Sequence, residues 1–333
     1  MAMSAARSPD RRAGARDSGV GSETGAGPET RLGSESAAGP ETRAGSQSDV
    51  SPETAARPLP FFYDLYTFRG DGGLTTVVAS FAVPAGRLQR EGGFSQARYR
   101  FDVTFVLADT ARRSVSRSDD SVYVSRPWPL DGDHLLHTHV EVQAPPSATT
   151  LQRVVMTDAT RPGVGQLYRS PFAIPDYRGR ELMLSDVALG LPGATSGWTR
   201  GDVVLALLPT SQFPESAFDV YYEIYNLPAG NPYVTEVAVE AVDEAGAPRG
   251  ERERPVRTFF AGESAPGAAG YVAELRRVES ALPEGRYRLT VTVTDEIADR
   301  TATRSRLFQV RAWEAGATMV PALPRTSQTA IGG

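Results

Sequence analysis

The side chains best suited to chemistry are concentrated in one short segment. All three histidines fall there, as His134, His137 and His139. If the segment is a strand, His137, His139 and Glu141 share one face, because side chains two residues apart point the same way. Two imidazoles and a carboxylate are ligands that zinc or copper accepts. These three residues are therefore the candidate metal site, and we expect them to face solvent.

The remaining residue types argue against most catalytic centres. The sequence has no cysteine, which removes thiolate ligands and cysteine nucleophiles. It contains no nucleophile-elbow, zinc-protease or Walker motif. Asp219 and Glu223 are interpreted as solvating residues on an outward strand face. We predict a non-enzymatic protein without a cofactor. A metal-dependent enzyme using the cluster of His134, His137 and His139 is the less favoured alternative.

Three aromatic residues are candidates for a binding surface. Tyr221 and Tyr225 fall on the polar face of their strand, and Trp128 lies between two prolines. Exposed, they would suit a protein or sugar ligand. Burial at a contact between domains is the favoured interpretation of all three residues. The tripeptide Arg69-Gly70-Asp71 spells an adhesion motif, but Gly and Asp are the residues expected in a turn there.

The elements that must position these side chains are short strands. Apolar and polar residues alternate in three runs, which is typical of antiparallel sheets with one wet face. The segment from Tyr271 to Leu282 is also predicted as a strand. The three inward-facing sets begin at Tyr99, Phe218 and Tyr287: Tyr99, Phe101, Val103, Phe105 and Leu107; Phe218, Val220, Tyr222 and Ile224; Tyr287, Leu289, Val291 and Val293.

These strands predict an all-β chain with two tandem immunoglobulin-like β-sandwich domains. Val154 to Asp158 resembles Val291 to Asp295, and a last strand follows each segment. The domains are expected at 61–175 and 180–311, joined by a short linker. Tyr287 follows a Pro-x-Gly turn, which suits either a tyrosine corner or an ordinary core tyrosine.

Both ends of the chain have a different composition. Residues 1–57 lack aromatics and repeat Pro-Glu-Thr every 12 residues, which predicts a disordered low-complexity arm. Residues 313–333 are predicted to be a second disordered tail. We see no export signal and no apolar run long enough to span a bilayer. The net charge of -5 gives no electrostatic reason to bind nucleic acid.

Several stretches resemble bacterial proteins of the GWxTD-domain family. The likeness lies in Asp64–Arg69 with its Gly-rich turn and the strand ending at Val83-Pro84, and in the segments 172–177, 184–189, 220–227 and 282–295. The naming motif is absent, because Gly197-Trp198-Thr199-Arg200-Gly201 has a different spacing. The resemblance implies an extracytoplasmic protein of the bacterial cell envelope.

The function expected from the sequence is structural or protein-interacting, with a protein partner and an undetermined oligomeric state. The alternative is a carbohydrate-binding accessory module that uses exposed aromatics, namely Trp128, Trp198 and the outward tyrosines.

Overall fold

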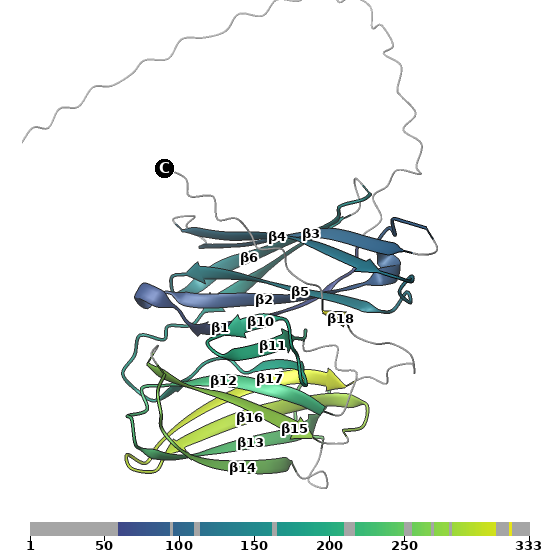
Figure 1. Cartoon of the computed structure of the whole chain (residues 1–333). Coiled ribbons are helices and arrows are strands. Elements are labelled where there is room, and N and C mark those ends of the chain that lie inside the picture. The colour runs from purple at the N-terminus through teal and green to yellow at the C-terminus, as the bar shows by residue number, and fades with distance from the viewer. Residues whose placement is uncertain are drawn as a thin grey trace, which may run out of the picture. The chain divides into compact units, whose positions relative to one another are not determined.

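The computed structural model describes residues 59–93, 96–109, 114–161, 165–209, 217–249, 255–267, 270–279, 282–310 and 320–321. The predicted N-terminal arm lies outside them. The described residues form an all-β protein (Figure 1) with two single-turn 3₁₀ helices, η2 (Asp71–Gly73) and η3 (Ala85–Arg87), and no α-helix. No described helix is both long enough and apolar enough to cross a membrane.

The N-terminal sandwich consists of two sheets. The β2 sheet has the strand order β1-β2-β5-β18, with β1 (Phe62–Arg69), β2 (Thr75–Pro84), β5 (Leu135–Ala144) and β18 (Val320–Pro321). The β3 sheet has the order β4-β3-β6-β7, with β3 (Ala97–Asp109), β4 (Val115–Arg126), β6 (Ser147–Asp158) and β7 (Gly165–Ile174). The alternating set from Tyr99 to Leu107 fills the core between these sheets, as predicted.

The C-terminal sandwich also consists of two sheets, one of six strands and one of four. The β12 sheet has the order β10-β11-β9-β12-β15, with β9 (Ala188–Leu191), β10 (Trp198–Arg200), β11 (Val203–Leu207), β12 (Ala217–Tyr225) and β15 (Tyr271–Glu279), and β8 (Met183–Leu184) also pairs with β12. The β16 sheet has the order β14-β13-β16-β17, with β13 (Pro232–Val242), β14 (Val256–Glu263), β16 (Gly285–Asp295) and β17 (Arg300–Val310). The sets that begin at Phe218 and Tyr287 face each other in its core.

Of the two alternatives for Tyr287, the structure supports the tyrosine corner. The hydroxyl of Tyr287 donates a hydrogen bond of 2.7 Å to the carbonyl oxygen of Pro283, four residues upstream. The bond holds the turn before β16 against the start of that strand. The repeated terminal hairpins are also present, because β6 pairs with β7 and β16 pairs with β17, both antiparallel.

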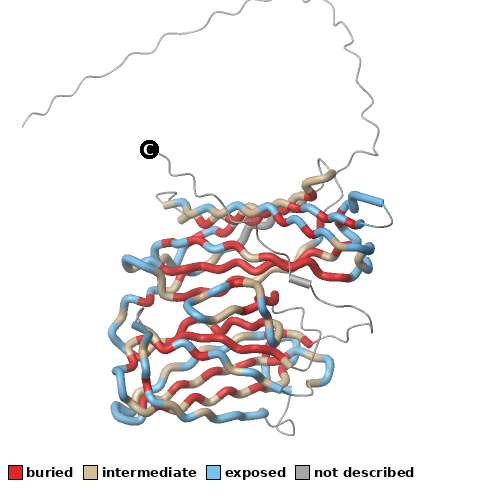
Figure 2. The backbone as a smooth tube through the Cα atoms, viewed as in Figure 1, coloured by how far each residue is buried: buried red, intermediate tan, exposed pale blue. Residues whose placement is uncertain are grey.

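Two strands are buried on both faces, which one-sided alternation does not predict. Every residue of β2 from Thr75 to Val83 is buried, as is every residue of β12 from Phe218 to Tyr225 (Figure 2). β2 is uncharged, as expected for a strand without a wet face. In β12, however, Asp219 and Glu223 are buried, which corrects their interpretation as solvating residues. Their face is covered by another layer of the protein.

Residues 52–333 form one compact unit, so the linker at 175–179 does not separate two compact bodies. Leu59 is fully buried in the N-terminal core, which therefore begins before the predicted boundary at residue 61. The prediction of a disordered tail is wrong for Val320 and Pro321, which pair with β5. The rest of that tail lies outside the described residues.

Candidate functional site at the contact between the sandwiches

The C-terminal sandwich meets the N-terminal one along the free edge of β1. A strand at a sheet edge presents backbone groups that need partners. The Arg306 guanidinium donates to the carbonyl oxygen of Leu65 at 2.7 Å and pairs with the carboxylate of Asp64. Two residues further on, the Thr67 N–H donates to the Asp186 carboxylate at 2.9 Å, and the Asp186 N–H donates to the Thr67 carbonyl at 3.0 Å. The second sandwich thus replaces a missing neighbouring strand.

The pattern continues at Arg69, again two residues along β1. Its N–H donates to the hydroxyl oxygen of Tyr225 at 2.8 Å, and its carbonyl accepts a 2.6 Å bond from Arg200. Because successive residues of a strand turn their backbone groups to opposite sides, every second residue needs an outside partner. These partners fix the register between the two sandwiches.

A buried carboxylate lies at the centre of this contact. Glu223 on β12 is fully buried, and Arg200 on β10 binds both of its oxygens, at 2.7 and 3.2 Å. The hydroxyls of Tyr221 and Tyr225 donate to the same carboxylate at 2.8 and 2.6 Å. The hydroxyl of Ser185 accepts from the Glu223 N–H at 2.9 Å. Both oxygens of the buried carboxylate are therefore satisfied.

The electrostatics of the cluster follow from burial. Burial by itself would lower the pKa of the Arg200 guanidinium, but the hydrogen bond and charge of Glu223 outweigh it and raise that pKa. Burial, and then the charge of Glu223, raise the pKa values of the Tyr221 and Tyr225 hydroxyls. Both hydroxyls stay protonated near neutral pH, and both serve as donors to the carboxylate.

Apolar packing surrounds the polar cluster. The Trp198 ring stacks on Phe68 with ring centroids 4.8 Å apart, and it meets Tyr221 edge-on at 5.5 Å. The Arg200 guanidinium lies 5.5 Å from the Phe68 ring centroid. The buried cluster consists of Tyr66, Phe68, Val78, Ala188, Trp198, Leu205, Leu207 and Tyr221. It draws on both sandwiches, so the contact has an apolar core of its own.

The linker packs into the same contact. Tyr177 is buried, and its hydroxyl lies 2.8 Å from that of Thr67. The Arg69 side chain donates to the Tyr177 carbonyl and to the Asn226 amide oxygen, both at 3.1 Å, and it lies over the Tyr225 ring. The tripeptide beginning at Arg69 does leave its strand in a turn, η2, as predicted. The arginine of the apparent adhesion motif is occupied inside the protein.

A groove of about 430 Å³ borders the contact on the side of β1 and β17. Its ionisable groups already have partners: Asp64 pairs with Arg306, and Asp186 holds Thr67. The residues that line it are Tyr63, Asp64, Leu65, Gln152, Phe172, Asp186 and Arg306. Such an arrangement favours a structural role for these side chains over acid–base catalysis, which needs a group free to exchange its proton.

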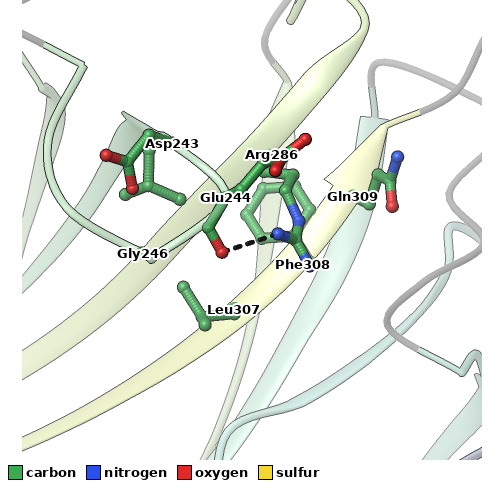
Figure 3. Close-up of a pocket in the computed structure, with 8 residues that line it drawn as sticks. Asp243, Glu244, Gly246, Arg286, Leu307, Phe308 and Gln309 are labelled. Atoms are coloured by element: carbon green, nitrogen blue, oxygen red, sulfur yellow. Dashed lines mark hydrogen bonds between the residues drawn. The ribbon is translucent and has the colours of Figure 1, made fainter.

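A second pocket, of about 190 Å³, lies at one end of the C-terminal sandwich, between the turn after β13 and the end of β17 (Figure 3). The Arg286 guanidinium crosses it and donates to the backbone carbonyl of Glu244 at 2.8 Å. The carboxylate of Asp243 accepts the Ala247 N–H at 2.8 Å and so closes the turn. The polar groups of this pocket hold its own loop.

The prediction that the histidines face solvent is wrong. His137 is buried with 6% exposure and His139 is half-buried, because β10 and β11 cover their face of β5. Glu141 is exposed, and one of its oxygens accepts a 3.2 Å bond from the Trp198 ring nitrogen. Over the described ranges, no three His, Cys, Asp or Glu residues are placed to hold a metal ion. His137, His139 and Glu141 therefore do not form the predicted site.

Burial, and then the charge of His134, lower the pKa of His137 to about 3 from an ordinary 6.5. The unfolded chain takes up this proton near pH 6.5 and the folded chain does not, so the unfolding free energy should fall as pH drops from 6.5 towards 3. His137→Leu should remove most of this loss. His139→Leu should remove less, because His139 is less buried. Urea titrations across this pH range measure the unfolding free energy. If this free energy fell as steeply with pH in His137→Leu as in the native protein, the loss could not be assigned to His137.

The three candidate aromatics separate into two groups. Tyr221 and Tyr225 are fully buried at the contact, so they form no exposed surface. For these two residues the favoured burial is confirmed. It is wrong for Trp128, which is 71% exposed.

Sequence reasoning missed Arg200, Asp186 and Arg306 as partners of the β1 edge. The uncharged run of β2 was the available signal, because a strand without charged side chains on either face is expected to be covered on both faces.

No protein-family model matches the sequence, and no curated protein matches it. Among solved structures, the chain is similar to red sea bream transglutaminase, with 12% identity and a TM-score of 0.22 over 75% of this chain and 31% of that one. It is also similar to Bacteroides uniformis beta-glucuronidase 2. A calcium-binding mutant of that protein gives 8% identity and a TM-score of 0.23, over 74% of this chain and 28% of that one.

The same glucuronidase, covalently bound to cyclophellitol-6-carboxylate aziridine, gives 7% identity and a TM-score of 0.23 over 72% of this chain and 26% of that one. The chain thus spans less than a third of the length of these structures.

Proposed function

We propose that the chain is a non-enzymatic structural or protein-interaction protein whose two sandwiches act as one rigid body. The observation that carries the proposal is the β1 edge, where Leu65, Thr67 and Arg69 take their outward hydrogen bonds from the other sandwich. A directional contact of this kind sets one orientation, because a shift along the strand would leave buried polar groups unpaired. Such a body is suited to holding its outer faces at a set distance.

The resemblance to GWxTD-domain proteins supports a role in the bacterial cell envelope. Three of the segments that carry the resemblance, Asp64–Arg69, 184–189 and 220–227, contribute to the contact. Their place at the contact agrees with a structural role. An extracytoplasmic location and a protein partner belong to this proposal.

The carbohydrate-binding alternative has less support. Of the four aromatic residues considered for it, Trp198, Tyr221 and Tyr225 are buried and only Trp128 is exposed. A sugar ring usually needs a platform of several groups, and Tyr221 and Tyr225 are occupied by Glu223.

Distance measurements between the sandwiches test the proposal. The native sequence has no cysteine, so Ser121→Cys on β4 and Thr258→Cys on β14, both at exposed positions, can be labelled with a pair of dyes. We expect single-molecule energy transfer to show one narrow distance distribution. The matched control carries Ser121→Cys and Ala148→Cys within the N-terminal sandwich. A clearly broader distribution between the sandwiches than within one would overturn the rigid-body proposal.

A further inference from the structure

One strand pairing differs from all others in the described part of the chain. β18 runs parallel to β5, with Val320 opposite Leu136 and Pro321 opposite His137, whereas the other pairings are antiparallel. Ten positions separate Val310, at the end of β17, from Val320. A segment beyond the C-terminal sandwich therefore returns to the N-terminal sandwich.

The other half of the β5 edge already has a partner. The Ser116 hydroxyl on β4 donates to the Gln143 carbonyl at 2.8 Å, so Gln143 turns its backbone groups to the free edge. The pairing of β5 with β2 continues without a register shift from Leu135 to Ala144. Backbone alternation therefore places the N–H and carbonyl groups of His137 and His139 on the same edge. This N-terminal half of the edge is where β18 lies.

β18 is a short partner. Pro321 has no N–H, so Val320 supplies the only backbone donor of the strand. Parallel pairing is also slightly less stable per residue than antiparallel pairing. The segment is held at an effective concentration on the order of millimolar by its tether. A competing strand can therefore displace this two-residue pairing.

We propose that the edge of β5 from Leu135 to His139 is a strand-accepting site, and that its resident occupant is the chain's own segment around Val320–Pro321. The site takes an extended backbone in parallel orientation, as in recognition by strand addition. The resident segment covers an edge that would otherwise be free to pair with other chains. This inference is independent of the rigid-body proposal, which concerns the edge of β1.

Amide hydrogen exchange tests the site. In the full chain, the His137 amide, which faces this edge opposite β18, should be protected, and ending the chain at residue 311 should make it exchange several-fold faster. The amides of Leu136 and Thr138 face β2 and should be unaffected. A synthetic peptide of residues 314–325, added at millimolar concentration to the shortened protein, should restore the protection. A scrambled peptide of the same composition should not. Unchanged exchange after truncation, or failure of the peptide to restore protection, would overturn the proposal.

Two proline substitutions separate the backbone contact from a general effect of the tail. Val320→Pro removes the only N–H of β18 and should reproduce the truncation. Thr326→Pro lies outside the paired residues and should leave the exchange of the His137 amide unchanged. Equal effects of the two substitutions would count against the site. Protection that grows with protein concentration, together with dimers in light scattering, would assign the edge to a second copy's tail and overturn the assignment within one chain.

Discussion

Glu223→Ala is expected to lower the free energy of unfolding by about 3–5 kcal/mol, the cost of removing one partner from a buried ion pair. Arg200 would keep its charge in a site where its side chain is only 16% exposed. The hydroxyls of Tyr221 and Tyr225 would lose their acceptor at the same time. Urea denaturation at neutral pH measures the change.

Two variants make this measurement specific. Glu223→Gln keeps the shape and one acceptor oxygen, so its loss of stability should be smaller than that of Glu223→Ala. Arg117→Ala breaks a pair of similar length, 2.8 Å to Asp119, on the exposed strand β4, and it should cause no measurable change because water replaces the partner. If Glu223→Ala and Arg117→Ala had the same effect, the cluster would not be the buried centre described above.

Trp198→Ala is expected to cost about 3–5 kcal/mol of unfolding free energy, as for other large aromatic residues removed from a packed core. Trp198 is 2% exposed and packs against Phe68 and Tyr221. Two effects add up: the protein no longer buries a large ring on folding, and a cavity is left between the two sandwiches. Thermal and urea denaturation should both report it.

The sequence contains its own control for this prediction. Trp128→Ala removes the same side chain from a position that is 71% exposed, and it should change stability by less than about 0.5 kcal/mol. Trp198→Phe should recover part of the loss, because a smaller ring can still stack on Phe68. A Trp198→Ala protein as stable as the Trp128→Ala protein would show that the contact contributes little to folding.

A polar contact between the sandwiches has a physical use beyond stability. Buried ion pairs often add little net stability compared with apolar residues of similar size, since desolvation offsets the attraction. Their bonds are directional, however, and Asp186, Arg200 and Arg306 each hold a different residue of one strand edge. The same bonds cover the β1 edge, which protects it from pairing with another chain.

Local sequence patterns determined the all-β class and the strand runs, and they limited Tyr287 to two roles, a tyrosine corner or a core tyrosine. Alternation from Tyr99 to Leu107 and from Tyr287 to Val293 decides which side chains enter a core, because it depends only on neighbours along the chain. The Pro-x-Gly turn before Tyr287 is likewise local. These features could be predicted without a partner element, and the structure places them as the sequence indicated.

Tertiary structure alone decided what covers the second face of a strand. His137, Glu223 and Tyr225 occupy positions that alternation assigns to water, yet each is buried because the other sandwich packs there. The Arg200 partner of Glu223 comes from a different strand, β10, and the partners of the β1 edge lie more than 100 residues away in sequence. Pairings over such separations depend on how whole sheets pack, and no periodicity along a single strand encodes them.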